Sequence, residues 1–292
     1  MDSLKLTSPG VINKIVREYN FRFSKGLGQN FLADENILNK IINSAMLVPG
    51  DRVLEIGAGI GTLTREISSR AEKVVAVEID KDLIPILEEN LKGRENIQII
   101  NGDILKLNLR ELEKIYFGGK PFKVIANLPY YITTPIIMTL LEEGLNLQLM
   151  VFTLQKEVAE RLTASPGTKA YGALTVAVNY YCHCEIISTV SRNVFFPKPG
   201  VDSAIIRLKM RQTPPVEVTD PELFFDIIKT VFKYRRKTLL NALSKDSSII
   251  GKKNRLESFL LSTGINPARR GETLSIEEFA RISNGIKGCQ LF

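Results

Sequence analysis

The chain has 292 residues, of which 44% are hydrophobic and 24% charged, a balance that favours a globular protein over a disordered or fibrous one. Its formal net charge of +7 indicates a polyanionic partner, either nucleic acid or an anionic membrane surface. Its longest apolar stretches are far shorter than the roughly 20 residues of a membrane helix, and no signal peptide pattern opens the sequence. Three cysteines without framework spacing argue against disulfides, so we expect a soluble, cytoplasmic protein that does not act at a membrane.

The first half of the chain alternates between short apolar runs and helical patterns. A polar segment with a helical pattern over residues 1–45 precedes an apolar run at 52–56 that stops at glycines, as a buried strand does. Later apolar runs predict further buried strands, separated by helical or loop segments, at 74–79, 97–100, 122–126 and 148–153. This alternation predicts an α/β fold with a parallel, doubly wound, Rossmann-like sheet.

The pattern changes after Ala170. Three runs there predict antiparallel strands added at one edge of the sheet, at 174–181, 184–190 and 203–210. Cys182, His183 and Cys184 look like a metal cluster, but alternation along a strand sends His183 to the face opposite both cysteines, and the chain has no other histidine. We therefore expect ordinary strand packing and no metal.

The last part of the chain is expected to be a small all-helical domain. The segment 211–215 is polar and contains prolines, and the pattern beyond it is helical, which predicts a first domain over residues 1–210 and a second over 211–292. From Pro215 onward, thirteen Lys and Arg residues stand against nine Asp and Glu, a local charge of +4. The basic residues form three clusters, at 233–237, 252–255 and 269–270. One cluster is typical of a solvated helix face, whereas three together favour phosphate binding.

A glycine-rich turn follows the first predicted strand. Residues 53–61 run from a strand through Gly57 and Gly59 into a helix, so the backbone can approach a ligand closely. Such a turn alone is weak evidence, since it also occurs in ordinary loops and in nicotinamide or flavin enzymes. Glu78, about 20 residues on, ends the next strand and can accept hydrogen bonds from ribose hydroxyls. Asp103 follows the third strand and can accept one from an adenine amine, although alone it is typical of a turn. Together they predict a nucleotide pocket.

The candidate reaction centre follows the fourth strand, at the same edge of the sheet. The lone pair of the adenine N6 amine is delocalised into the ring, so its methylation requires acceptors that hold both N–H groups. The side-chain oxygen of Asn127 and the carbonyl of Leu128 can be those acceptors. Pro129 fixes the local backbone, and Tyr130 offers a ring on which a base can stack. The alternative is a plain proline and aromatic turn at a strand end.

A second segment with prolines and aromatic residues, 195–202, can close the other face of that base. We assign the stacking to Phe195. The sequence leaves open whether Phe196 has this role instead, and either ring can belong to the core.

Several segments together resemble the ribosomal RNA adenine dimethyltransferases: residues 24–32, the glycine turn, 127–130, 195–203 and 232–239. The segment 264–274 narrows the resemblance to the bacterial small-subunit members, over nearly the whole chain. The family's turn often has proline where this chain has Ala58, a change that leaves the glycines in place. The resemblance implies a methyltransferase domain with S-adenosylmethionine contacts from Asn30, Leu32, Gly57, Glu78, Asp103 and Asn127.

The resemblance also implies a substrate. It is expected to be two adjacent adenines in a hairpin loop near the 3′ end of 16S rRNA, converted to N6,N6-dimethyladenosine within an immature small ribosomal subunit. A loop base can be splayed out at lower cost than a base in a duplex. The helical domain is expected to hold flanking rRNA, and we expect a monomer. The predicted RNA contacts are Arg235, Arg236, Lys237, Arg269 and Arg270.

Two alternative functions stay open. The nearest is the related large-subunit methyltransferase that confers macrolide resistance, which the segments 235–239 and 269–274 disfavour. The other is an rRNA-binding assembly factor for which methylation is secondary, because a basic domain can dock without catalysis.

Overall fold

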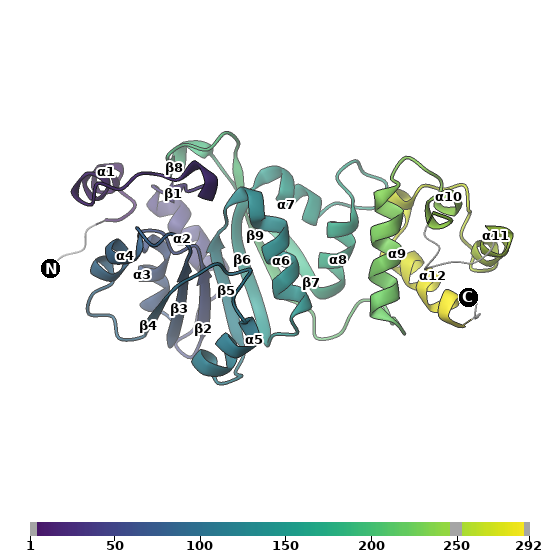
Figure 1. Ribbon diagram of the computed structural model, residues 1–292, viewed down its shortest axis with the longest axis horizontal. Coiled ribbons are helices and arrows are strands. Elements are labelled where there is room, and N and C mark those ends of the chain that lie inside the picture. The colour runs from purple at the N-terminus through teal and green to yellow at the C-terminus, as the bar shows by residue number, and fades with distance from the viewer. Residues whose placement is uncertain (1–4, 246–252, 289–292) are drawn as a thin grey trace. The chain divides into compact units, whose positions relative to one another are not determined.

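The computed structural model describes residues 5–245 and 253–288, and these form two compact units (Figure 1). The first unit contains residues 1–159 and 183–210, and the second contains 160–182 and 211–292. The expected boundary after Met210 is therefore one point at which the chain passes between the units. The segment 160–182, which we expected in the first domain, groups with the second.

The first unit is built on a seven-stranded sheet with the order β4-β3-β2-β5-β6-β9-β7. Strands β2 to β6 pair in parallel, and β9 is antiparallel to β6. The strands are β2 (Arg52–Ile56), β3 (Lys73–Glu78), β4 (Ile97–Asn101), β5 (Phe122–Asn127), β6 (Leu147–Gln155), β7 (Cys182–Val190) and β9 (Ser203–Met210). The predicted strands in these regions are confirmed. A separate pair joins β1 (Phe31–Leu32) to β8 (Phe195–Phe196).

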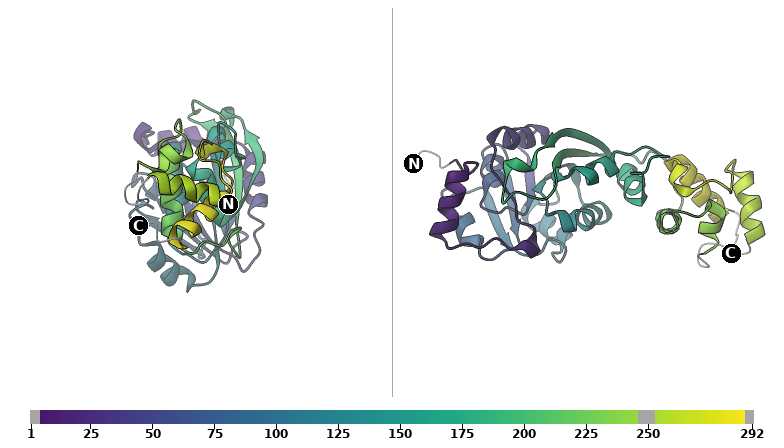
Figure 2. Two further views of the ribbon diagram at one scale, coloured as in Figure 1. Left: turned by 90° about the vertical axis from the view of Figure 1, so that its right-hand side faces the viewer. Right: turned by 90° about the horizontal axis from the view of Figure 1, so that it is seen from above.

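Helices cover both faces of this sheet (Figures 1 and 2). They are α2 (Glu35–Ser44), α3 (Thr62–Ser68), α4 (Ile84–Asn90), α5 (Leu109–Leu112), α6 (Thr133–Glu142) and the start of α7 (Lys156–Leu162). Helix α1 (Pro9–Glu18) instead packs through Ile12 and Ile15 in a cluster with Phe31, Ile60 and Leu83. Helix α2 begins at Asp34, whose carboxylate accepts a hydrogen bond from the backbone amide of Ile37. Apolar side chains of α2 and α3 pack on one face of the sheet, among them Leu38, Ile41, Leu63 and Ile67 against Val53, Ile125 and Val151. The packing holds the carboxyl ends of the strands in place.

The predicted strand over residues 174–181 is wrong, because the chain forms helix α8 (Ala173–Tyr181) there. The run is rich in β-branched and aromatic residues, and it is buried on most sides, so it shows no helical stripe of polar residues. Gly172 starts the helix, and its amide donates a hydrogen bond to the hydroxyl of Thr175. An apolar run with no periodicity predicts a strand or a buried helix equally well, and tertiary packing decides.

The regular elements described in the second unit are mainly helices. Besides α8 they are α9 (Pro221–Lys233), α10 (Leu239–Leu243), α11 (Lys253–Ser262) and α12 (Ile276–Gly288). Their apolar faces meet in one core that includes Phe224, Ile228, Leu256, Phe279 and Ile282. Helix α9 starts at Asp220, which caps the amide of Leu223, and Pro221 occupies the first turn, where its missing N–H costs nothing.

Candidate functional site

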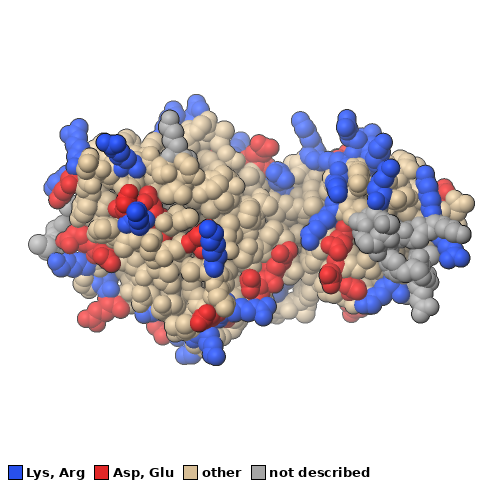
Figure 3. Space-filling view, in the orientation of Figure 1, with Lys and Arg blue, Asp and Glu red and all other residues tan. Residues whose placement is uncertain are grey.

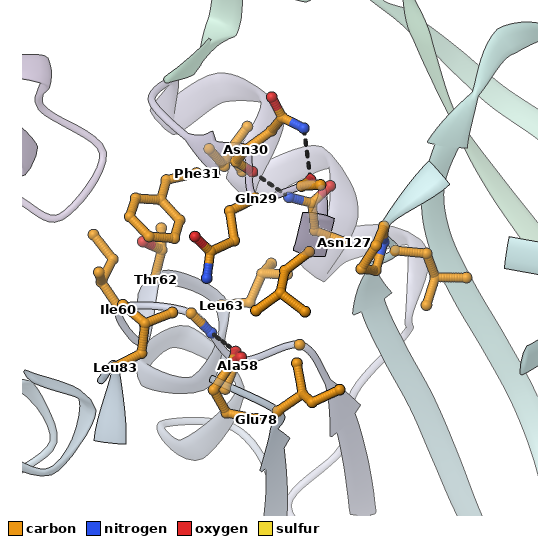
Figure 4. A pocket seen from close by; sticks show the side chains of 18 of the residues that line it. Gln29, Asn30, Phe31, Ala58, Ile60, Thr62, Leu63, Glu78, Leu83 and Asn127 are labelled. Carbon is orange, nitrogen blue, oxygen red and sulfur yellow. Dashed lines mark hydrogen bonds between the residues drawn. The ribbon is translucent and has the colours of Figure 1, made fainter. Parts of the chain in front are cut away.

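A pocket opens at the carboxyl edge of the parallel strands in the first unit (Figure 4). Its wall is made by the segment 27–32, the turn after β2, the end of β3 and the residues that follow β5. Those three strands are neighbours in the sheet, so their ends converge. The structure thus brings together the predicted site residues Asn30, Leu32, Gly57, Gly59, Glu78 and Asn127 to Tyr130.

The glycine turn has the geometry that the sequence predicts. Gly57 has φ of +76° and Gly59 has φ of +58°, in the left-handed region that favours glycine. A Cβ atom on Gly59 would lie 3.3 Å from the Phe31 ring, so this position is also tightly packed. The amide of Gly59 donates to Oε2 of Glu78 at 2.7 Å, which ties the turn to the next strand (Figure 4).

Glu78 is almost completely buried at the end of β3. Its second oxygen, Oε1, accepts from the amide of Asp80 at 2.9 Å. Burial raises the pKa of Glu78, while the amides of Asp80 and Gly59 lower it. Asp103 does not line the pocket. Its Oδ1 accepts from the amide of Leu105, as the turn interpretation expects, and its place as a ligand contact stays a prediction.

Asn127 ends β5 with its side chain held in one orientation. Its Nδ2 donates to the backbone carbonyl of Asn30 at 2.8 Å (Figure 4). An amide group has one donor side and one acceptor side. Because Asn30 receives the donor, Oδ1 is left as the acceptor at this strand end. Asn30 is itself fixed, since its Nδ2 donates to the carbonyl of Gly28 at 2.8 Å.

The residues after Asn127 are anchored from both sides. The amide of Leu128 donates to the carbonyl of Thr153 on the neighbouring strand β6 at 3.0 Å. The hydroxyl of Tyr130 lies 2.6 Å from Oγ of Ser203 on β9. Burial raises the pKa of Tyr130, so the ring stays uncharged at neutral pH. Leu128 and Tyr130 are therefore hydrogen-bonded to two strands of the sheet, β6 and β9.

The two phenylalanines of β8 have different surroundings. Phe195 is 4% exposed and packs in the core with Leu32 and Ile205, which is the core position that the sequence left as an alternative. Phe196 is partly exposed and lies with its ring centre 5.5 Å from that of Phe23. Strand alternation gives the two rings opposite directions, and Phe196 is the one with free surface.

Several pocket residues escaped the sequence prediction, among them Gln29 and Glu55. Gln29 lines the pocket, where its Nε2 donates to Asp80 at 2.5 Å and its Oε1 accepts from the amide of Ser24 at 2.8 Å. Its place inside the segment 24–32 was the available signal. Glu55, next to the carboxyl end of β2, also lines the pocket, and its carboxyl group is completely buried. A charged residue inside an otherwise apolar strand was the signal for it.

The basic residues of the second unit divide into paired and unpaired groups. Nε of Arg235 is 2.9 Å from Glu272, and Arg269 makes a two-pronged contact with Glu278. Arg236, Lys237 and Arg270 are exposed and have no ion pair among the described residues. Lys252 of the middle cluster lies outside those residues.

The two outer basic clusters meet in space, although more than thirty residues separate them in the sequence. Thr238 and Arg270 form an antiparallel bridge, and the amide of Leu239 donates to the carbonyl of Arg269. Figure 3 shows Lys and Arg side chains gathered over the part of this unit that contains α9 and α10. We call the exposed residues Arg236, Lys237 and Arg270 the basic patch.

The part of the chain that the structure describes contains neither a metal-binding cluster nor a membrane-spanning helix. Within residues 5–245 and 253–288, no group of three or more His, Cys, Asp or Glu side chains is arranged to hold a metal ion. Cys182 is buried and His183 exposed, in keeping with the predicted alternation, while Cys289 lies outside the described residues. No helix in the described part of the chain is both long enough and apolar enough to cross a membrane.

The chain is similar to known ribosomal RNA methyltransferases. A family model described as ribosomal RNA adenine dimethylase matches residues 20–287. A protein of Clostridioides difficile (strain 630), named ribosomal RNA small subunit methyltransferase A, is 49% identical over 282 residues, 97% of each chain. One of the same name from Alkaliphilus metalliredigens (strain QYMF) is 50% identical over 286 residues, 98% of this chain and 99% of that one.

Solved structures agree with these relatives. A dimethyladenosine transferase from Plasmodium falciparum has a TM-score of 0.75 at 26% identity, covering 89% of this chain and 98% of its own. The 23S rRNA methyltransferase ErmE has a TM-score of 0.67 at 30% identity, covering 88% of this chain and 100% of its own. The family model, the relatives and the shared fold together show that the chain belongs to the ribosomal RNA adenine dimethylase family.

Proposed function

We propose that this protein transfers methyl groups from S-adenosylmethionine to N6 of two adjacent adenines in a hairpin loop near the 3′ end of 16S rRNA. The substrate is an immature small ribosomal subunit in the cytoplasm, the product is N6,N6-dimethyladenosine, and the protein acts as a monomer. Relatives at 49% and 50% identity carry the name of the small-subunit methyltransferase, which favours the small over the large subunit. The observation that carries the proposal is the fixed side chain of Asn127 beside a nucleotide-type pocket.

The residues present fit S-adenosylmethionine. The open glycine turn leaves room for a ligand against its backbone, and Glu78 stands at the strand end where ribose hydroxyls are bound in such folds. Thr62 lines the same pocket, and its buried hydroxyl has no hydrogen-bond partner in the part of the chain that the structure describes. Bound there, S-adenosylmethionine supplies an electrophilic methyl group. The residues that would hold it are Asn30, Leu32, Gly57, Gly59, Glu78, Asp103 and Asn127.

The chain's contribution to the reaction is to hold the amine. Because Nδ2 of Asn127 is bound to Asn30, its Oδ1 can accept one N–H of the adenine amine, and the carbonyl of Leu128 can accept the other. Two acceptors favour a pyramidal nitrogen with its lone pair available for attack. The methylated nitrogen becomes cationic and loses its proton to water, so no strong general base is needed.

Aromatic rings hold the base itself. Tyr130, fixed by Ser203, offers one face for stacking, and Pro129 shapes the turn before it. For the second face we propose Phe196 in place of Phe195, because Phe195 is buried in the core. A target adenine splayed out of a hairpin loop would then be held between two rings.

The basic patch is proposed to bind rRNA phosphates. Arg236, Lys237 and Arg270 are exposed and without ion pairs among the described residues, so binding a phosphate breaks no internal contact. Arg235 and Arg269 belong to the same predicted set, but their pairs with Glu272 and Glu278 give them a positioning role as well.

Methyl transfer to purified ribosomal particles tests the proposal. Immature small subunits, large subunits and S-adenosylmethionine are incubated with the protein, and rRNA nucleosides are analysed by mass spectrometry. We expect N6,N6-dimethyladenosine in 16S rRNA alone. Methylation of the large subunit would support the macrolide-resistance alternative. Binding of the small subunit without any methylation would support the assembly-factor alternative.

A further inference from the structure

Glu55 is an anomaly in the sheet. It lies next to the carboxyl end of β2, is completely buried, and neither carboxyl oxygen has a hydrogen-bond partner among the described residues. An ionised carboxylate in such a place is costly unless it is paired or hydrogen-bonded. Buried polar groups in folded proteins nearly always have partners, so an unpartnered one calls for an explanation.

The location of Glu55 supplies that explanation. The residue lines the candidate pocket two positions before Gly57, where β2 enters the glycine turn. The pocket also contains Glu78, and its lining residues include no Lys or Arg. Two carboxyl groups without a basic partner make a wall that suits a positively charged ligand.

The groups that face Glu55 decide its charge. Burial raises its pKa to about 8. The hydroxyl and amide of Thr64 on α3 lie near enough to lower it although they form no hydrogen bond with it, and the charge of Glu78 adds a smaller rise. On β5 its register partner is the apolar Ile125. Glu78 is the ionisable group whose charge acts on Glu55 within the described residues. At neutral pH an empty pocket therefore keeps Glu55 protonated.

We propose that Glu55 responds to ligand charge, giving up its proton when a cationic ligand fills the pocket and taking one back when that charge is lost. In the step, the carboxyl O–H bond breaks, the proton goes to water or buffer, and the carboxylate remains to balance the ligand's charge. The inference rests on the proposed function. S-adenosylmethionine carries a positive sulfur, whereas the sulfur of S-adenosylhomocysteine is uncharged. The site would therefore favour the methyl donor over the spent product, which helps product release.

Binding calorimetry in buffers of different ionisation heat measures the proton directly. At pH 7 we expect the protein to release roughly one proton more on binding S-adenosylmethionine than on binding S-adenosylhomocysteine. Both ligands carry an amino acid group, whose own titration is measured for each free ligand and subtracted. The difference should vanish near pH 9.5, where Glu55 is ionised with or without ligand.

Glu55→Gln tests the assignment to this residue, because glutamine has nearly the shape of the protonated acid. We expect the extra proton release to disappear and the preference for S-adenosylmethionine over S-adenosylhomocysteine to fall about tenfold. Glu88→Gln, an exposed acid on α4 that loses the same charge, should behave as the wild type.

The outcomes separate the inference from the proposed function. Equal proton release and equal preference in the wild type and Glu55→Gln would overturn the role of Glu55 while leaving the proposed function intact. Failure of the wild type to bind S-adenosylmethionine would overturn both. If Glu55→Gln does not fold, the pH dependence of proton release in the wild type still decides, since a pH-independent difference contradicts the inference.

Discussion

Buried polar groups have hydrogen-bond partners at the amino end of the parallel strands, whereas several at the carboxyl end have none in the described part of the chain. At the amino end, Nζ of Lys123 donates to the carbonyls of Ala45 and Met46 and to the carboxylate of Asp51, at 3.1, 2.7 and 2.7 Å. Both charged side chains there are only 11% exposed, and each has its partner. At the carboxyl end, buried side-chain oxygens have no hydrogen-bond partner among the described residues, namely those of Glu55, Thr62, Thr64 and Thr153.

Along the same strands, the amino end serves the stability of the fold and the carboxyl end serves function. Leaving a buried polar group unpaired costs free energy, so a fold that is complete in itself pairs such groups, as the amino end does. Two of these residues, Glu55 and Thr62, line the candidate pocket, at the end where ligands bind in folds of this class. We infer that the carboxyl end is completed by its ligands. Substitutions at the two ends should therefore have different effects.

The largest expected effect on stability comes from Glu55→Gln and depends on pH. The pKa of Glu55 rises from 4.5 to about 8 on folding, so between these values the folded protein keeps a proton that the unfolded chain has released. The wild type thus loses stability as pH rises through this window, by at most about 1.4 kcal/mol per pH unit. Glu55→Gln lacks this loss. Relative to the wild type it should gain up to about 4 kcal/mol from pH 5 to pH 8, measured by urea unfolding.

If the difference in stability between Glu55→Gln and the wild type did not change with pH, Glu55 would be ionised in the folded protein. A gain in stability together with weaker binding of S-adenosylmethionine would show that the carboxyl end gives up stability for function.

At the amino end, Lys123→Met should destabilise the protein by about 3 kcal/mol, because Asp51 and two helix-end carbonyls lose their partner. Urea unfolding measures the loss, and Lys120→Met, at an exposed position, is the control. Affinity for S-adenosylmethionine should be unchanged in the folded protein. A loss below 1 kcal/mol would mean that the pair is not important for stability, and the contrast between the two ends would weaken.

The second unit offers the same contrast between paired and unpaired charges. Removing the basic patch with Arg236→Gln, Lys237→Gln and Arg270→Gln should leave stability nearly unchanged. The slope of the logarithm of the rRNA binding constant against the logarithm of the salt concentration should become shallower by roughly 0.7 to 0.9 per lost phosphate contact. Arg269→Gln should instead lower stability, by about 1 kcal/mol, since it removes the two-pronged contact with Glu278, which keeps the amide of Ser275 and a longer contact with Arg281 at 3.9 Å. An unchanged salt dependence in the triple variant would exclude the basic patch from the rRNA interface.

The smallest expected effect is that of Tyr130→Phe. It removes the hydrogen bond to Ser203 but keeps the ring, so stability should fall by about 1 kcal/mol and methyl transfer by only a few-fold. Tyr130→Ala removes the stacking surface and should cost far more activity. Equal activity of the two variants would contradict the stacking role. Tyr19→Phe, at an exposed tyrosine of the same unit, is the control.

The features that the sequence predicted best are those determined by a local pattern of residues. Short apolar runs predicted the parallel strands, and the spacing from the glycine turn to Glu78 predicted two sides of the pocket, because both depend on residues close in the chain. It failed for residues 174–181, where packing of the second unit selects a helix. The role of Asn30 in orienting Asn127 joins residues 97 positions apart, so no local pattern contains it.

Phe195 and Phe196 also show that a local pattern does not reveal long-range contacts. Composition marks both rings as candidates, but only the pairing of β8 with β1 determines which of them enters the core. Glu55 was visible as a charge in an apolar strand, yet its lack of partners is a property of the folded chain.

The central claim is that Asn127 holds the amine of the target adenine. Asn127→Ala should reduce formation of N6,N6-dimethyladenosine in immature small subunits by at least ~100-fold, the usual cost of one preorganised group that acts in the transition state. Asn43→Ala, at an exposed position on α2, should be as active as the wild type. The measurement is mass spectrometry of rRNA nucleosides after a fixed reaction time at saturating S-adenosylmethionine. Undiminished dimethylation by a folded Asn127→Ala protein would contradict the account.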